Sequence, residues 1–166
     1  MRGLFAVLML VLGLSACGYH LVGQGDSSGV ISKDVTQVVL VAADQRGKLF
    51  SVFRKKLARS YDVPIVRASE AMPDAVEIRM ENMAETMTAS AFDSSGIANQ
   101  YRVSISGVLR VVQSGKELWV SEAISVSGDV FATGGTVAIE AQKERVLQDL
   151  RDEWVQKALG RLRSGF

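Results

Sequence analysis

The fold class is decided by the stretch YRVSISGVLRV, residues 101–111. Its apolar side chains recur at every second position, with Gly107 in register. Alternation with a period of two is typical of a strand that buries one face and exposes the other. The stretch therefore predicts a long strand in a sheet that is covered on one side. The apolar positions are Tyr101, Val103, Ile105, Leu109 and Val111.

Two further alternating stretches flank this strand, and hairpins should join all three as antiparallel neighbours. In the upstream stretch the apolar side chains occupy even-numbered positions up to Met80 and odd-numbered positions from Met83 onward. This change of parity predicts a β-bulge near Asn82. The downstream stretch follows a tight turn at Ser114-Gly115 and is interrupted by Glu122. The apolar positions are Val76, Ile78, Met80, Met83, Met87 and Ala89 upstream, and Leu118, Val120, Ile124, Val126 and Val130 downstream.

The remaining elements complete an α+β order. The run VVLVA, residues 38–42, has the pattern of a buried strand, and apolar residues at helical spacing predict an amphipathic helix from Arg46 to Ser60. A second helix is expected from Val137 to Leu162, with Ile139, Leu147, Leu150, Trp154, Ala158 and Leu162 inside. The order β-α-β-β-β-α predicts a two-layer sandwich: a four-stranded mixed sheet with two helices on one face. The first two strands should be parallel, because a helix joins them.

The N-terminus has the features of an export signal. Arg2 is followed by an uncharged run, Gly3 to Leu14, which is shorter than the roughly 20 residues of a membrane-spanning helix. The sequence Leu14-Ser15-Ala16-Cys17 then matches a lipobox, so we predict cleavage before Cys17 and acylation of its thiol, for example with palmitate. Gly18, in place of Asp, favours the outer membrane over the inner one. We expect a signal peptide at 1–16, a tether at 17–37 and one domain at 38–166.

Three predicted connections, 43–46, 92–99 and 131–136, should share the end of the sheet opposite the tether. The loop end with Phe92, Asp93, Gly96 and Gly134 should therefore point away from the anchor.

Composition excludes several classes of function. Removal of residues 1–16 takes away Arg2 and no acid, so the mature chain would have 18 basic and 18 acidic residues. It therefore lacks the basic excess that would indicate binding to nucleic acid. Cys17 is the only cysteine, which excludes an intramolecular disulfide. His20 is the only histidine, so neither a Ser-His-Asp site nor a zinc site is indicated. We expect no metal, no cofactor and no enzymatic activity.

Three carboxylates are candidates for chemistry. Glu81 and Glu85 could form an acid–base pair, but a solvated strand face accounts for them more simply. Glu122 falls on an apolar parity, which leaves two alternatives: an interface contact, or a bulge that displaces it into water.

The face of the sheet opposite the core should be lined by small hydroxyls, where a plain solvent face usually has Lys and Glu. Such a surface can hydrogen-bond to a partner at low desolvation cost. Trp119 would be its one large aromatic, either a binding residue or a single exposed tryptophan. The predicted face comprises Thr86, Thr88, Ser90, Arg102, Ser104, Ser106, Ser121, Ser125 and Ser127.

Two motifs resemble the LptE family of LPS-assembly lipoproteins, also called RlpB. The sequence CGYHL at 17–21 is similar to the start of their mature chains, and AFDSSGIANQYR at 91–102 is similar to their hairpin. The resemblance implies a non-enzymatic partner, about 1:1, of the outer-membrane barrel LptD. It would lodge in the barrel lumen and help lipopolysaccharide (LPS) reach the cell surface, while anchored at the periplasmic face.

The candidate contact residues for the barrel or for LPS are Phe92, Tyr101, Arg102, Arg110 and Trp119. The aromatics would act as rigid anchors and the arginines would meet acids or phosphates. Alternatively, the aromatics cap the core and the arginines are solvated. Other functions left open are an auxiliary lipoprotein of an ABC-type lipid transport system and a cell-wall or lipid hydrolase.

Overall fold

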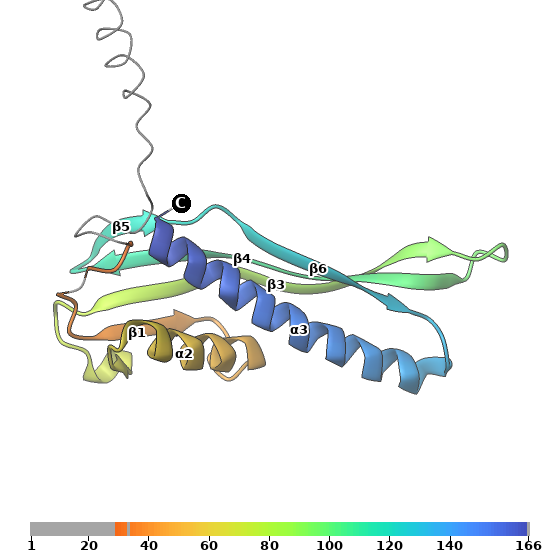
Figure 1. The fold of residues 1–166 in the computed structure, drawn as a ribbon, viewed down its shortest axis with the longest axis horizontal. Coiled ribbons are helices and arrows are strands. Elements are labelled where there is room, and N and C mark those ends of the chain that lie inside the picture. The colour runs from red at the N-terminus through yellow and green to blue at the C-terminus, as the bar shows by residue number, and fades with distance from the viewer. Residues whose placement is uncertain (1–28, 33, 166) are drawn as a thin grey trace, which may run out of the picture.

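The structure is a computed structural model that describes residues 29–32 and 34–165. The predicted signal peptide, Cys17 and His20 lie outside the described residues. Figure 1 shows an elongated molecule in which a long sheet is accompanied by two helices. The elements are β1 (Val38–Ala42), α2 (Lys48–Tyr61), β2 (Ile65–Val66), η2 (Ala68–Glu70), β3 (Val76–Phe92), β4 (Ala98–Gln113), β5 (Lys116–Val120), β6 (Ile124–Phe131) and α3 (Gly135–Ser164).

The sheet is mixed, as predicted, but it has six strands and not four. The order is β2-β1-β3-β4-β5, and β6 pairs with β4 as well. The strand β1 is parallel to β3, and β4 is antiparallel to β3, β5 and β6, which confirms the predicted directions. One additional strand is the short β2, which is parallel to β1. The other arises because the predicted third strand is split into β5 and β6.

The split occurs at Ser121, which was expected on the solvent face and is instead buried. Its hydroxyl accepts a hydrogen bond from the Leu109 amide at 2.9 Å, and its own amide donates to the Leu109 carbonyl at 2.8 Å. From Ser121, which bonds to Leu109, to Ile124, which pairs with Gly107, the chain advances three residues while β4 advances two. The extra residue in this break reverses the parity of β5 relative to β6. As a result Leu118 and Val120 are exposed and were wrongly assigned to the core.

The core lies between the sheet and the two helices, and Trp154 of α3 is at its centre. Its side chain is 0% exposed, packs edge-to-face on Phe53 of α2 and donates its indole N–H to the Ile124 carbonyl at 3.0 Å. Gly107 leaves room beneath it, because a Cβ there would lie 3.3 Å from the Trp154 ring and 2.1 Å from the sulfur of Met83, so the Met83 side chain would have to move. The buried face of α3 also includes Arg151, Val155 and Leu159, which the sequence pattern missed.

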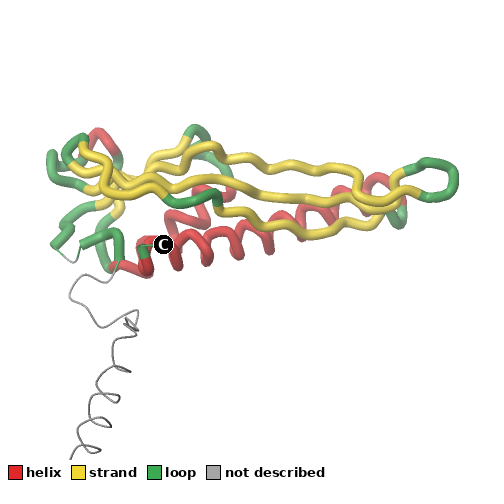
Figure 2. Tube along the Cα trace, turned by 90° about the horizontal axis from the view of Figure 1, so that it is seen from above, coloured by secondary structure: helices red, strands yellow, loops and turns green. Residues whose placement is uncertain are grey.

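Beyond β1 the sheet continues as a three-stranded arm, which we define as residues 84–92, 98–107 and 124–131 (Figure 2). The β1–β3 pairing ends at Ala42–Met80, whereas β3 remains paired with β4 as far as Phe92. At the base of the arm, Asn82 has φ +53° and the register shifts between Glu81 and Ala84, which confirms the predicted bulge.

The arm also decides where the connections lie. Because β1 is so much shorter than β3, residues 43–47 lie beside the bulge, midway along the molecule, and not at the distal end as predicted. The turns at 93–97 and 132–134 do lie at the distal end (Figure 1). The N-terminal segment joins at the opposite end, where the Val30 amide donates to the Leu162 carbonyl of α3 at 2.8 Å.

Candidate interaction surface

The outer face of the arm, the side away from the helices, is lined by hydroxyl side chains in cross-strand rows. Thr86, Ser104 and Ser127 form one row across the three strands, and Ser106 pairs with Ser125 in the next. The Thr86 and Ser104 hydroxyls are hydrogen-bonded at 2.7 Å. These rows form because polar residues alternate with the buried Val103, Ile105 and Val126 along the same strands.

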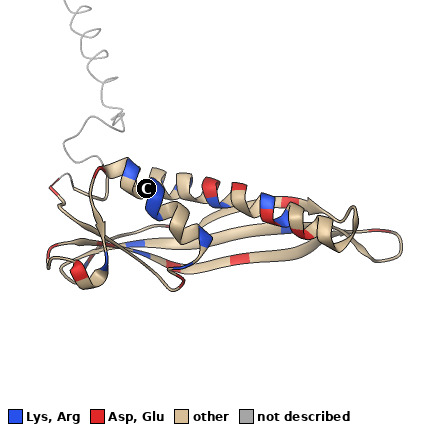
Figure 3. Cartoon of the chain, turned by 90° about the horizontal axis from the view of Figure 1, so that it is seen from below, with Lys and Arg blue, Asp and Glu red and all other residues tan. Residues whose placement is uncertain are grey.

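Charge is sparse on this face, and Figure 3 shows the arm strands with few acidic or basic residues. Arg102 donates to Asp129 at 3.2 Å, with the two side chains 57% and 35% exposed. An exposed pair of this kind contributes little to stability. A partner strand or loop could therefore approach the short hydroxyls closely without desolvating an array of fixed charges.

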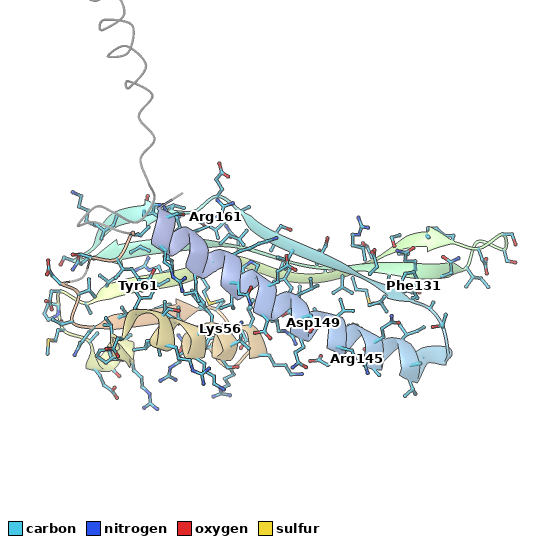
Figure 4. The ribbon with its side chains drawn as sticks, viewed as in Figure 1. Lys56, Tyr61, Phe131, Arg145, Asp149 and Arg161 are labelled. Atoms are coloured by element: carbon cyan, nitrogen blue, oxygen red, sulfur yellow. The ribbon has the colours of Figure 1, made fainter. Side chains whose placement is uncertain are left out.

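The distal tip presents apolar side chains to solvent. Phe92 is 60% exposed and Ile97 65%, on either side of the hairpin turn, and Phe131 at the end of β6 is 49% exposed (Figure 4). The turn itself is well defined, because the Asp93 carboxylate accepts hydrogen bonds from the Ser95 and Ile97 amides at 2.8 and 2.9 Å. Asp93 therefore organises the turn, and the exposed apolar residues around it form the tip.

Arg110 is on the outer face, as predicted, but it already has acidic partners. Its guanidinium donates to both oxygens of Glu81, at 3.1 and 3.0 Å, and to Glu117. Hydrogen bonding to Glu81 and then to Glu117 raises the pKa of Arg110. This cluster lies at the base of the arm, so Arg110 and Arg102 do not form one continuous cationic site.

Two of the predicted aromatic contacts are on the inner side of the sheet. Tyr101 is paired with Ala89 and Val130 and packs against the core cluster while partly exposed. Trp119 is paired with the buried Val111, so it faces the core and not the hydroxyl surface, and its indole N–H donates to the Gly165 carbonyl at 3.0 Å. Its expected place on the outer face was wrong, because the extra residue in the β5–β6 break reverses the parity of β5 relative to β6.

The carboxylates have structural partners. Glu85 lies on the helix side of the sheet, not on a solvated face, and accepts two 2.9 Å hydrogen bonds from the buried Arg151. Arg151 also donates to Glu144, whose pKa is lowered first by its hydrogen bond with Lys48 and then by Arg151. Glu122 lies in the β5–β6 break with a side chain 90% exposed, so displacement into water is the correct alternative.

A groove of about 970 Å³ opens where β1 ends and the β3 bulge begins. Its walls include Leu49 and Phe50 of α2, Met83 of β3 and the Glu85–Arg151 pair. Most of its charged groups are already paired with one another, which makes it a poor site for acid–base chemistry. Among residues 29–32 and 34–165, no three His, Cys, Asp or Glu side chains are grouped to hold a metal ion. Within that same part, no helix is long and apolar enough to cross a membrane.

Solved structures with the same fold are bacterial lipoproteins. Rare lipoprotein B from Shewanella oneidensis aligns with 75% of this chain and 91% of its own, at 19% identity and a TM-score of 0.62. Lipoprotein B from Nitrosomonas europaea aligns with 78% of this chain and 83% of its own, at 14% identity and a TM-score of 0.65. A minor lipoprotein from Acinetobacter baumannii aligns with 78% of this chain and 92% of its own, at 10% identity and a TM-score of 0.63. This chain has the lipoprotein B fold, which is that of the LptE family.

No protein-family profile matches the chain, and no curated protein sequence matches it.

Proposed function

We propose that this chain is an outer-membrane lipoprotein that binds inside the LptD barrel, assists its assembly and so enables LPS to reach the cell surface. In this role it is a binding partner and not an enzyme. Acylated Cys17 would hold it at the periplasmic face while the distal tip reaches into the lumen.

The observation that carries the proposal is the long arm with its sparsely charged hydroxyl face. At roughly 3.3 Å per residue, the part of β3 that lies in the arm, residues 84–92, is about 30 Å long, comparable to the ~30 Å hydrocarbon core of a bilayer. An element of that length can contact a barrel wall over most of the height of the membrane. The short side chains of the outer face allow that contact to be close.

The tip supplies the second part of the argument. Exposed Phe92 and Ile97 beside a turn ordered by Asp93, together with Phe131 at the end of β6, give the arm an apolar distal end. Exposed apolar clusters of this kind are typical of interaction sites. Arg102 is the candidate for contact with an acid or phosphate, because its existing partner, Asp129, holds it only in an exposed pair.

The test is Phe92→Ala combined with Arg102→Gln. Glutamine is preferred to glutamate at this position, because an acid would face Asp129 and would perturb the fold for an unrelated reason. We expect normal melting of the isolated chain, a reduced yield of the 1:1 barrel complex and greater sensitivity to large hydrophobic antibiotics. The matched control, Leu118→Ala with Lys116→Gln, alters an exposed apolar and an exposed basic residue at the opposite end of the molecule.

Co-purification from solubilised outer membranes separates the alternatives. A large β-barrel partner supports the proposal, and an ABC transporter supports an auxiliary role in lipid transport instead. Normal barrel assembly in the tip variant, together with a melting temperature many degrees lower, would make Phe92 and Arg102 structural residues.

The anchor gives an independent test. If the arm supplies most of the contact, Cys17→Ala behind a cleavable signal peptide should yield soluble periplasmic protein that still joins the barrel at high expression. Failure to associate at any expression level would remove the main physical argument for a lumenal position.

A further inference from the structure

The charged residues of the first helix of the domain, and of the residues just before it, are all basic. From Gln45 to Tyr61 there is no Asp or Glu, although the chain as a whole has 19 basic and 18 acidic residues. The basic residues in this segment are Arg46, Lys48, Arg54, Lys55, Lys56 and Arg59.

Two of these cations have acidic partners on α3. Lys48 pairs with Glu144, and Lys56 pairs with Asp152 at 2.6 Å. The other four are exposed and have no ion pair within the described part of the chain. Because Leu49, Phe53 and Leu57 form the buried stripe of α2, its solvent face carries the unpaired charge. Figure 4 shows long nitrogen-tipped side chains projecting from α2 away from the sheet.

The same face contains a shallow hollow of about 400 Å³ between α2 and the edge strand β2. Arg54 and Lys55 line it together with the apolar side chains of Phe50 and Ile65. Cations beside an apolar surface match the chemistry of a phospholipid headgroup, in which a phosphate is attached to glycerol and acyl chains.

The position of α2 in the molecule places this face near the expected anchor. Its C-terminal turn contacts the C-terminus of α3, where Arg163 donates to the Ser60 hydroxyl at 3.2 Å. The N-terminal segment joins the domain at the same helix end, through Val30 and Leu162. From Cys17 to Gly29 the chain can span at most about 40 Å. A bilayer that holds acylated Cys17 is therefore within reach of α2.

We propose that the solvent face of α2 is a docking site for the phosphate groups of anionic phospholipids in the leaflet that holds the anchor. Arg54, Lys55 and Arg59 bind headgroups, and Phe50 and Ile65 contact the glycerol and upper acyl region. A row of exposed cations on flexible side chains suits mobile lipid phosphates, whereas a fixed acidic protein surface would require their positions to match. The proposal concerns the membrane side of the molecule and does not depend on the identity of the barrel partner.

Vesicle binding tests the proposal with the Cys17→Ala chain, which lacks the lipid. The probes are vesicles with 30% phosphatidylglycerol in phosphatidylcholine, and vesicles of phosphatidylcholine alone. Each cation near an anionic surface is worth about 1 kcal/mol, or about fivefold in affinity, so Arg54→Gln with Lys55→Gln should weaken binding about twenty-five-fold. The control is Lys116→Gln with Arg145→Gln, which removes two exposed cations that have no ion pair among the described residues.

The expected result is binding to the anionic vesicles alone, lost at high salt, reduced by the α2 variant and changed less than twofold by the control. Equal loss in both variants would mean that net charge, and not this face, governs binding. Displacement by millimolar inorganic phosphate at constant ionic strength would indicate a free-phosphate site instead. Absence of binding to anionic vesicles would overturn the proposal and would leave an acidic protein as the partner for this face.

Discussion

Replacement of Arg151 by methionine should destabilise the domain by about 2 kcal/mol. The arginine side chain is 9% exposed, donates two 2.9 Å hydrogen bonds to Glu85 and one of 3.0 Å to Glu144, and so joins β3 to α3. Hydrogen bonds to charged groups are worth about 1.5–3 kcal/mol each when a partner is left buried. Glu85 and Glu144 are 37% and 50% exposed, so water can replace much of their interaction with Arg151 when the arginine is removed. The expected loss of about 2 kcal/mol is therefore smaller than the sum over three buried hydrogen bonds.

Urea unfolding of the Cys17→Ala chain measures this effect, and for a domain of this size about 2 kcal/mol corresponds to a drop of about 6–8 °C in Tm. Methionine keeps most of the aliphatic packing of arginine, so the loss reports mainly on the ion network. The matched control is Lys48→Met, which removes an ion pair with side chains 68% and 50% exposed and should cost less than about 0.5 kcal/mol. If Arg151→Met unfolds within 0.5 kcal/mol of the parent, or costs no more than the control, the network does not hold β3 to α3.

Three further predictions concern stability. The hydroxyl of Tyr61 is buried without a hydrogen-bond partner in the described part of the chain, and burial raises its pKa. Removal of this hydroxyl in Tyr61→Phe should therefore stabilise the domain by about 1 kcal/mol, measured by urea unfolding. A loss of stability instead would show that the hydroxyl has a partner. Asn82 has φ +53°, a left-handed conformation that glycine adopts easily and a β-branched residue does not. In thermal melts the stability of Asn82→Gly should therefore be nearly unchanged, whereas Asn82→Val should lose about 1–2 kcal/mol of stability. Similar melting of the two variants would contradict the left-handed bulge. Lys48 and then Arg151 lower the folded pKa of Glu144, so this carboxylate stabilises the fold above its ordinary value of 4.5, and that contribution is lost as pH falls through the lowered pKa. Melting curves across that acid range should show a smaller pH dependence in Lys48→Met, and an unchanged dependence would exclude the pair as its source.

Much of the fold could be predicted because its main elements have strong local patterns. The alternation in β3 and β4 and the helical spacing in α2 and α3 are set by which side chains must leave water, so strand directions and the bulge at Asn82 followed. The short β2 was missed, because two residues have no periodicity to detect and pair only when β1 is already in place.

The candidate surface was predicted in part for the same reason. The hydroxyl rows of Thr86, Ser104, Ser106, Ser125 and Ser127 follow from parity, and the structure places them together across three strands. The alternation mispredicted the side of Trp119, because the extra residue in the break after Ser121 is set by how β5 and β6 pair with β4, which no local pattern encodes. It failed at Arg151 too, since a charged residue among apolar helix positions is buried only when Glu85 from a distant strand is present to pair with it.

The sequence by itself predicted most of the order of elements and their amphipathic faces, because these depend on neighbours within a few residues along the chain. The tertiary structure alone decided that β3 and β4 extend beyond β1 as an arm and that Phe92, Ile97 and Phe131 are exposed toward its distal end. It also decided that Arg110 is paired with two glutamates, whereas Arg54 and Lys55 have no ion pair among the described residues. The difference has a physical cause: hydrophobic burial is a property of one segment, whereas charge pairing depends on which segments the whole fold brings within reach of each other.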